Sequence, residues 1–112
     1  MEINIPAMQD YLKERYGGWT TEQSLFMKLV EEMGEAAEVL NMRSGAKLEN
    51  GTDLKQELGK ELADIIHYAV AIAAITDIPL NQVMLEKDIK SSLKYHHDTN
   101  LTLFLKQRSG EA

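Results

Sequence analysis

Apolar residues recur every three or four positions along most of this 112-residue chain, which is the spacing of helices that bury one face. The pattern predicts four main helices, near residues 5–16, 20–42, 54–76 and 80–96. Pro6 suits the first turn of the first helix, and Gly17-Gly18 marks its end. We therefore expect an all-α fold.

The two longest predicted helices have capping signals at their starts. Thr20 and Asp53 are each followed by a glutamine three positions later, which is the spacing of a capping box. The stretch between these helices contains the turn signal Asn50-Gly51. A short connection favours antiparallel neighbours, so we predict an antiparallel helical bundle in a single domain over residues 1–112.

The tail, residues 99–112, has an ambiguous pattern. Leu101, Leu103 and Leu105 alternate with other residues as in a strand, but three positions are too few to define one. Contact with a partner or a frayed end explains the tail equally well.

Composition narrows the class of partner. The formal charge of −6 and the pI near 5.0 argue against nucleic acid or an anionic membrane surface, since both favour basic patches. Without cysteine, neither disulfides nor thiolate zinc ligation is available. The start lacks a basic end followed by an apolar run, and the longest apolar run, "AVAIAAI", is too short to span a bilayer. We expect a cytoplasmic protein whose partner is a small molecule or another protein.

The second and third predicted helices share one pattern at an offset of 29 residues. Both read L-x-x-x-L-x-x-E-x-x-[E/D], and the acidic positions lie beside the leucine face. We call these four residues the acidic cluster: Glu32, Glu35, Glu61 and Asp64. If the helices pack antiparallel through their leucines, the two acid pairs converge at one edge of the interface.

Four carboxylates at close range cannot all stay ionised unaided, because like charges raise each other's pKa. Either protonation or a hard divalent cation such as Mg²⁺ or Mn²⁺ would compensate. The simpler alternative is a solvated acidic helix face, which is how most helical charge runs behave. The duplication in register with the apolar face favours a functional cluster.

The combined motif resembles that of the MazG-like all-α nucleoside triphosphate pyrophosphohydrolases, relatives of the dimeric dUTPases. "EEMGEAAEVL" is similar to the family's first acidic segment and "ELADIIHYAVAIA" to its second. "DIPLNQVMLEK" resembles the entry to its last helix, with Lys87 as the basic residue there. The similarity runs from about residue 8 to 95. Ser91 departs from it, standing where many members have asparagine.

The resemblance implies Mg²⁺-dependent hydrolysis of a nucleoside triphosphate, a deoxynucleotide or a non-canonical nucleotide, to the monophosphate and pyrophosphate. It makes Glu32, Glu35, Glu61 and Asp64 the expected metal ligands, and Glu35 the expected catalytic residue that orients or deprotonates water. Mn²⁺ is a possible substitute. Cations would join an acidic pocket to a polyphosphate that it otherwise repels.

Basic and aromatic residues supply further candidates for substrate binding. Lys87 and Lys94 are seven residues apart, so they share one helix face and can meet the phosphate tail, although members often have arginine at the second position. Trp19 and Tyr68 are candidates for stacking on the base. Each of these residues also has a plain structural explanation, as a surface lysine or a core aromatic.

The remaining polar residues near the motif are expected to support it at most. Glu31 and Glu38 lie further round the second helix and more simply solubilise it. His67, His96 and His97 are interpreted as surface residues or as neighbours of the metal ligands.

Two other functions fit parts of the sequence. A non-enzymatic helical interaction module would use the acidic stripe to meet a basic partner, and it predicts no metal dependence. A di-iron oxidoreductase would need two E-x-x-H elements, and only the altered "DIIH" is present. Long apolar stripes on so small a chain also predict a homodimer or a dimer of dimers.

Overall fold

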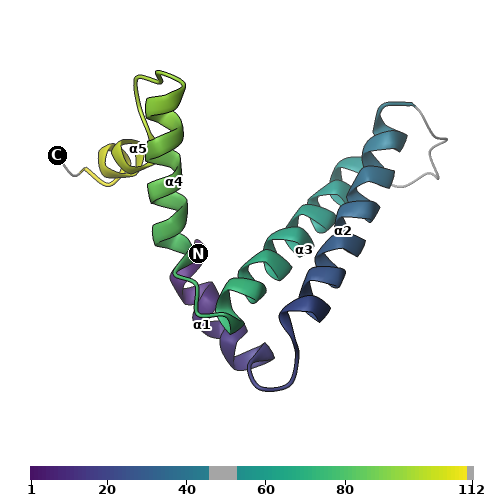
Figure 1. Ribbon diagram of the computed structural model, residues 1–112. Helices are drawn as coiled ribbons and strands as arrows, with labels where there is room; N and C mark the ends of the chain where they lie inside the picture. The colour runs from purple at the N-terminus through teal and green to yellow at the C-terminus, as the bar shows by residue number, and fades with distance from the viewer. Residues whose placement is uncertain (46–52, 111–112) are drawn as a thin grey trace. The chain divides into compact units, whose positions relative to one another are not determined.

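The computed structural model describes residues 1–45 and 53–110, and every regular element in these ranges is helical. The helices are α1 (Ile5–Tyr16), α2 (Glu22–Arg43), α3 (Leu54–Ile75), α4 (Leu80–Lys94) and α5 (Leu101–Arg108) (Figure 1). The prediction of an all-α fold is therefore confirmed. The predicted Asn50-Gly51 turn lies outside the described residues.

Helix starts follow from the capping residues. Asp53 accepts hydrogen bonds from the backbone of Lys55 and Gln56 at 3.1 and 3.2 Å, as the capping signal predicts. At the start of α2 the cap is Thr21 rather than Thr20, and Thr21 Oγ1 accepts from Ser24 N at 3.1 Å. The prediction was one residue early because both positions are threonine.

The tail forms a fifth helix, not a strand. Asn100 begins α5 by accepting a hydrogen bond from Leu103 N at 2.9 Å, and the Asp88 carboxylate of α4 accepts one from Leu101 N. These contacts satisfy donors that a helix start leaves unpaired. The alternating leucines lie on this helix and do not build a strand, and two of them, Leu103 and Leu105, are about half exposed.

The chain divides into two compact units, Met1–Ile78 and Pro79–Ala112. In the first unit α2 and α3 run side by side over 22 residues each, and α1 packs on α3 (Figure 1). In the second unit α5 packs on α4. The interpretation of residues 1–112 as one domain stays a prediction.

Small residues let the helices of the first unit approach closely. The buried positions of α3 are mostly alanine and valine, while Leu12 of α1 is fully buried against them. The side chain of Gln9 donates hydrogen bonds to the carbonyls of Ala73 and Ile78, where α3 ends. Lys13 forms an exposed ion pair with Asp77 next to them. Helix α1 thus fixes the end of α3 that follows the acidic cluster.

Seven large apolar side chains of the α2–α3 pair stay between 43% and 58% exposed. We call them the apolar stripe: Phe26, Met27, Val30, Met33, Leu40, Leu62 and Ile66. Most of them repeat at alternating spacings of three and four, so they form a second helical face beside the buried one.

Within the described residues no single helix is both long and apolar enough to cross a membrane. By length and composition alone, Leu54–Ile75 and Leu80–Lys94 pass that test only when they are taken together across the bend between them.

Leu12→Ala should lower the free energy of unfolding by about 2–5 kcal/mol, because it leaves a cavity where α1 meets α3. Urea unfolding followed by circular dichroism measures this change. Leu93→Ala is the control, since Leu93 is 73% exposed and its truncation should cost less than about 0.5 kcal/mol. Equal effects of the two substitutions would show that Leu12 is not a core residue.

Candidate active site

The antiparallel packing of α2 and α3 brings acidic residues of both helices together. Glu32, Glu61 and Asp64 each offer a carboxylate oxygen, and these atoms all lie within 4.8 Å of one another. Glu32 and Glu61 are half-buried, whereas Asp64 is exposed. These three carboxylates therefore converge as the matched patterns predict.

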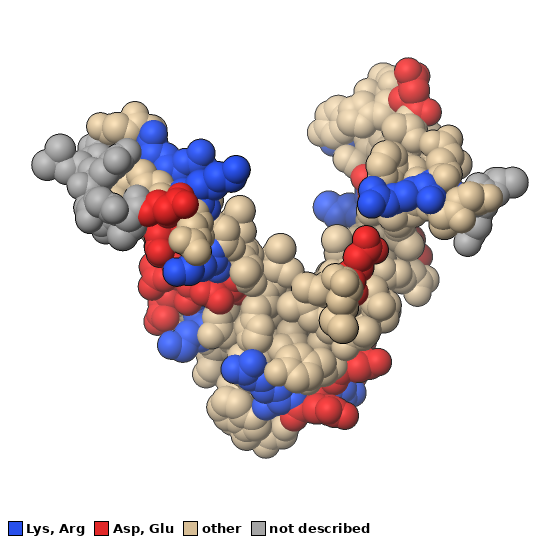
Figure 2. Space-filling model, turned by 180° about the vertical axis from the view of Figure 1, so that it is seen from behind, with Lys and Arg blue, Asp and Glu red and all other residues tan. Residues whose placement is uncertain are grey.

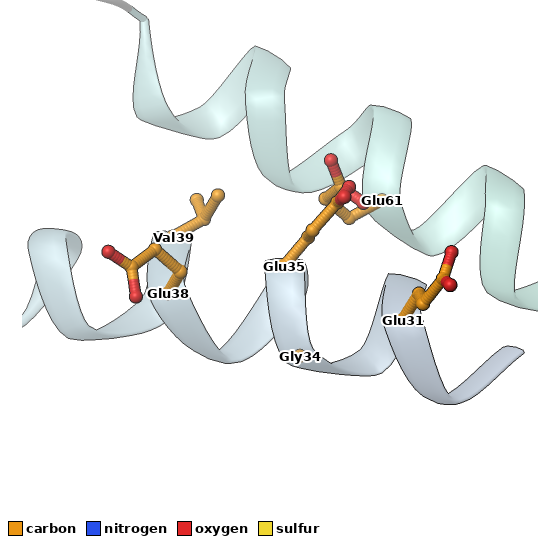
Figure 3. A pocket seen from close by; sticks show the side chains of 6 residues that line it. All are labelled: Glu31, Gly34, Glu35, Glu38, Val39 and Glu61. Atoms are coloured by element: carbon orange, nitrogen blue, oxygen red, sulfur yellow. The ribbon is translucent and has the colours of Figure 1, made fainter. Parts of the chain in front are cut away.

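Glu35 lies beside these three residues, close enough to Glu61 for a hydrogen bond between the two carboxyl groups. Figure 3 shows Glu35 of α2 and Glu61 of α3 pointing toward each other across the helix pair. Both line an open cleft of about 570 Å³, together with Glu31, Glu38 and two small residues of α2. We call this the acidic cleft. Figure 2 shows acidic side chains gathered over the α2–α3 pair.

The carboxylates of the cluster are partly buried and repel one another, and both effects favour the protonated form. Glu32 Oε2 and Glu61 Oε2 are buried and, when both groups are ionised, receive no hydrogen bond from residues 1–45 and 53–110. A hydrogen bond to Glu61, burial and the charges of Glu35 and Asp64 raise the pKa of Glu32 to about 7. Burial and the neighbouring Glu35 also raise the pKa of Glu61, against the opposing effect of the hydrogen bond from Glu32.

These residues fit a divalent cation on two grounds. The ligands are all carboxylate oxygens, which Mg²⁺ and Mn²⁺ prefer. Moreover, a cation would satisfy the two buried oxygens that residues 1–45 and 53–110 leave without a donor. Glu32, Glu61 and Asp64 would hold such an ion, and Glu35 stands close enough to influence it electrostatically.

A second cleft, of about 600 Å³, lies earlier along α2. Its lining includes the predicted stacking residues Trp19 and Tyr68, and also Arg15, Tyr16 and Lys28. We call it the aromatic cleft. Burial, the neighbouring Tyr16 and the charge of Glu32 raise the pKa of Tyr68, so this cleft borders the acidic cluster.

The two clefts flank the cluster along the helix pair. On α2, Lys28 lines the aromatic cleft, Glu32 follows one turn later, and Glu35 lines the acidic cleft. On α3 the same order runs backwards through Tyr68, Asp64 and Glu61, as expected for antiparallel neighbours. A ligand with one flat end and one anionic end could therefore place its flat end in the aromatic cleft and its anionic end beside the acidic cluster.

Sequence analysis did not single out three residues of the aromatic cleft: Arg15, Tyr16 and Lys28. The position of Lys28 near the cluster could have been predicted, because it precedes Glu32 by four residues and so shares its helix face. Its amine lies 3.4 Å from the Glu31 carboxylate, an exposed pair of small energetic weight. Arg15 and Tyr16 are brought to the site by the packing of α1, which periodicity does not reveal.

The histidines fall into two groups. His96 and His97 are exposed, as expected of surface residues. His67 is half-buried, and its Nε2 lies 2.7 Å from the Tyr16 hydroxyl in a hydrogen bond. Burial and the nearby Arg15 lower the pKa of His67, so a surface position does not describe it.

Lys87 and Lys94 lie on α4, in the second unit, and both are exposed. The Lys94 amine sits 5.4 Å from the centre of the Tyr95 ring. Their contact with a phosphate tail stays a prediction.

Without divalent cations, wild-type stability should fall relative to Glu32→Gln as pH rises from 5 to 8. The folded pKa of Glu32 is above its ordinary value of 4.5, so the folded state holds a proton that the unfolded state has released. That stability is complete below about pH 4.5 and is lost as pH passes about 7. Thermal unfolding in EDTA should show a relative loss of a few degrees, and Mg²⁺ should restore it at pH 8. A constant difference between the two proteins across this range would contradict the raised pKa.

Comparison with known proteins places this site in a family. Residues 20–94 match the MazG nucleotide pyrophosphohydrolase domain. The chain is similar to the crystal structure of iMazG from Vibrio DAT 722, with 26% identity and a TM-score of 0.60, covering 83% of this chain and 98% of that one. It is also 28% identical to the uncharacterized protein YpjD of Bacillus subtilis over 72 residues, which is 64% of this chain and 65%, just under two thirds, of that relative's length. Because the domain match includes the whole acidic cluster and more than half of the chain, this protein belongs to the MazG nucleotide pyrophosphohydrolase domain family.

Proposed function

We propose that this protein hydrolyses a nucleoside triphosphate to the monophosphate and pyrophosphate with the help of Mg²⁺. The observation that carries the proposal is the convergence of Glu32, Glu61 and Asp64 within 4.8 Å, with two buried oxygens that receive no hydrogen bond from the described part of the chain. The family match to a nucleotide pyrophosphohydrolase domain supports the same reaction class. Deoxynucleotides and non-canonical nucleotides are the expected substrates.

Each part of the site has a distinct task in this proposal. Glu32, Glu61 and Asp64 hold the cation, which when bound supplies Lewis-acid chemistry that neutralises phosphate charge and eases deprotonation of water. Glu35 accepts the proton of the attacking water from its exposed position beside Glu61. Water adds to the α-phosphorus, and cleavage of the α–β anhydride bond releases pyrophosphate and leaves the nucleoside monophosphate. Mn²⁺ should substitute for Mg²⁺, since both prefer oxygen ligands.

The aromatic cleft provides the place for the base. Trp19 is 70% exposed, so its ring face is available for stacking, and Tyr68 faces the same cleft from α3. A base held there would leave its phosphates next to the cluster, because the cleft borders Glu32 and Asp64. Lys87 and Lys94 are proposed to contact the phosphate tail.

The apolar stripe supports a homodimer, or a dimer of dimers. About half of each of its seven side chains is exposed, which is roughly 600 Å² per copy and roughly 1,200 Å² in a symmetric pair, within the range of specific interfaces. A shallow groove lined by Phe26, Met27 and Ile72 adjoins it. A two-helix layer buries little by itself, so a second copy of α2 and α3 is the partner that completes its core.

Glu61→Gln should keep the fold, abolish metal-dependent pyrophosphate release and weaken Mg²⁺ binding at least about tenfold, because it removes a charged ligand at the centre of the cluster. Glu57→Gln is the matched control: Glu57 lies one turn earlier on α3 and pairs only loosely with Lys60, at 3.3 Å. Pyrophosphate release and Mg²⁺ calorimetry measure the two effects. If Glu61→Gln turned over substrate like the wild type, the non-enzymatic interaction module would become the better account of the acidic face.

Phe26→Glu should shift the protein from dimer to monomer, since it places a charge within the apolar stripe. Sedimentation velocity over a range of protein concentrations measures the shift. Phe104→Glu is the control, because it makes the same chemical change at a residue on α5 outside the stripe. Phe104 is 53% exposed and Phe26 is 54% exposed. A Phe26→Glu protein that stayed dimeric would exclude this face as the interface.

A further inference from the structure

One hydrogen bond joins the end of α1 to the middle of α3 beside the aromatic cleft. The Tyr16 hydroxyl lies 2.7 Å from His67 Nε2, and the two rings meet edge to face at 5.6 Å between centroids. Tyr16 is only 7% exposed, so this bond forms in a mostly desolvated place. It connects residues that are 51 positions apart in the chain.

Each partner of this bond also contacts one wall of the aromatic cleft. Tyr16 lies against Trp19, with ring centroids 5.8 Å apart and planes tilted by 38°. His67 lies against Tyr68, edge to face at 5.0 Å. The series Trp19, Tyr16, His67, Tyr68 therefore runs without a break from one wall to the other.

Trp19 depends on this series for its position. It follows Gly17-Gly18, and Gly18 has a φ of 89°, a left-handed conformation that suits glycine. Apart from its contact with Tyr16, Trp19 is held by the hydrogen bond that its Nε1 donates to the Arg15 carbonyl at 2.7 Å. Arg15 in turn places its guanidinium 5.3 Å from the centre of the Tyr16 ring. The ring contact and the hydrogen bond of Trp19 thus involve Tyr16 and its neighbour Arg15.

We propose that Tyr16 and His67 are positioning residues that set the separation of Trp19 and Tyr68, and thereby the affinity of the site for the base of its nucleotide. The inference rests on the proposed function, because it takes the aromatic cleft as the base site. Neither residue needs to touch the reacting phosphates. Their effect should therefore appear equally in substrate and transition-state binding, which changes KM and leaves kcat unchanged.

Tyr16→Phe tests the proposal most cleanly, since it keeps the ring and its packing and removes only the hydroxyl. We expect a rise in KM of roughly fivefold, the equivalent of one hydrogen bond, with kcat within about twofold of wild type. His67→Leu should act alike, whereas His67→Gln, whose amide can replace Nε2, should recover much of the affinity. Tyr11→Phe, on the exposed side of α1 at 58% exposure, is the control. A drop in kcat with KM unchanged, or no change at all, would overturn the positioning role.

A second readout does not depend on turnover. Trp19 is the single tryptophan of the chain, so its fluorescence reports the aromatic cleft directly. Titration of the wild type with a nucleoside monophosphate should quench this fluorescence, and Tyr16→Phe should need roughly five times more ligand. Failure of wild-type hydrolysis alongside such a difference would reject the proposed reaction and keep the positioning role. Normal hydrolysis with identical titrations would reject only the positioning role.

Discussion

The facing carboxylates of Glu32 and Glu61 are the constraint on which the rest of the structure depends. They meet between two helices that could have packed more stably with apolar residues at the same positions. Two of their oxygens are buried and, when both groups are ionised, receive no hydrogen bond from the described residues. A hydrogen bond to Glu61, burial and the neighbouring charges raise the pKa of Glu32 to about 7. This arrangement costs stability near neutral pH, and a cation held by these carboxylates would offset that cost.

The position of the carboxylates explains the order of the other features. Because α2 and α3 are antiparallel, one pair of helices presents an aromatic surface, a ligand set and an acidic cleft in succession. The acidic charge of the chain, −6 overall, would repel a polyphosphate, and a cation held by the cluster would offset that repulsion. Helix α1 contributes no carboxylate to the cluster, yet it supplies Arg15 and Tyr16 and so shapes the end where a base would lie.

Much of this could be predicted from the sequence because it depends on local order. The 3.6-residue repeat locates α1 to α4, and the matched spacing of acids against leucines predicts that Glu32, Glu61 and Asp64 meet once the helices pack. Helix α5 was missed: its start depends on the Asn100 cap and on Asp88, thirteen residues before Leu101, and only the cap is visible in the sequence. Of the two interpretations of His67, a surface residue does not fit its half-buried position, whereas a neighbour of the expected metal ligands does, since Asp64 is near enough to affect its pKa. Its hydrogen bond to Tyr16 was not predicted, because Tyr16 reaches it only through the docking of α1. Roles for Lys87 and Lys94 stay predictions, because helix periodicity places them on α4 and says nothing of what they face.

The most direct test is release of pyrophosphate from a panel of nucleoside, deoxynucleoside and modified nucleoside triphosphates at neutral pH, each with Mg²⁺ and with excess EDTA. The account predicts that monophosphate and pyrophosphate appear in equal amounts, only with the cation, and that one base class is preferred. Absence of turnover across the panel, from folded protein that binds no Mg²⁺, would contradict a catalytic cluster and leave the acidic face to be explained by a protein partner.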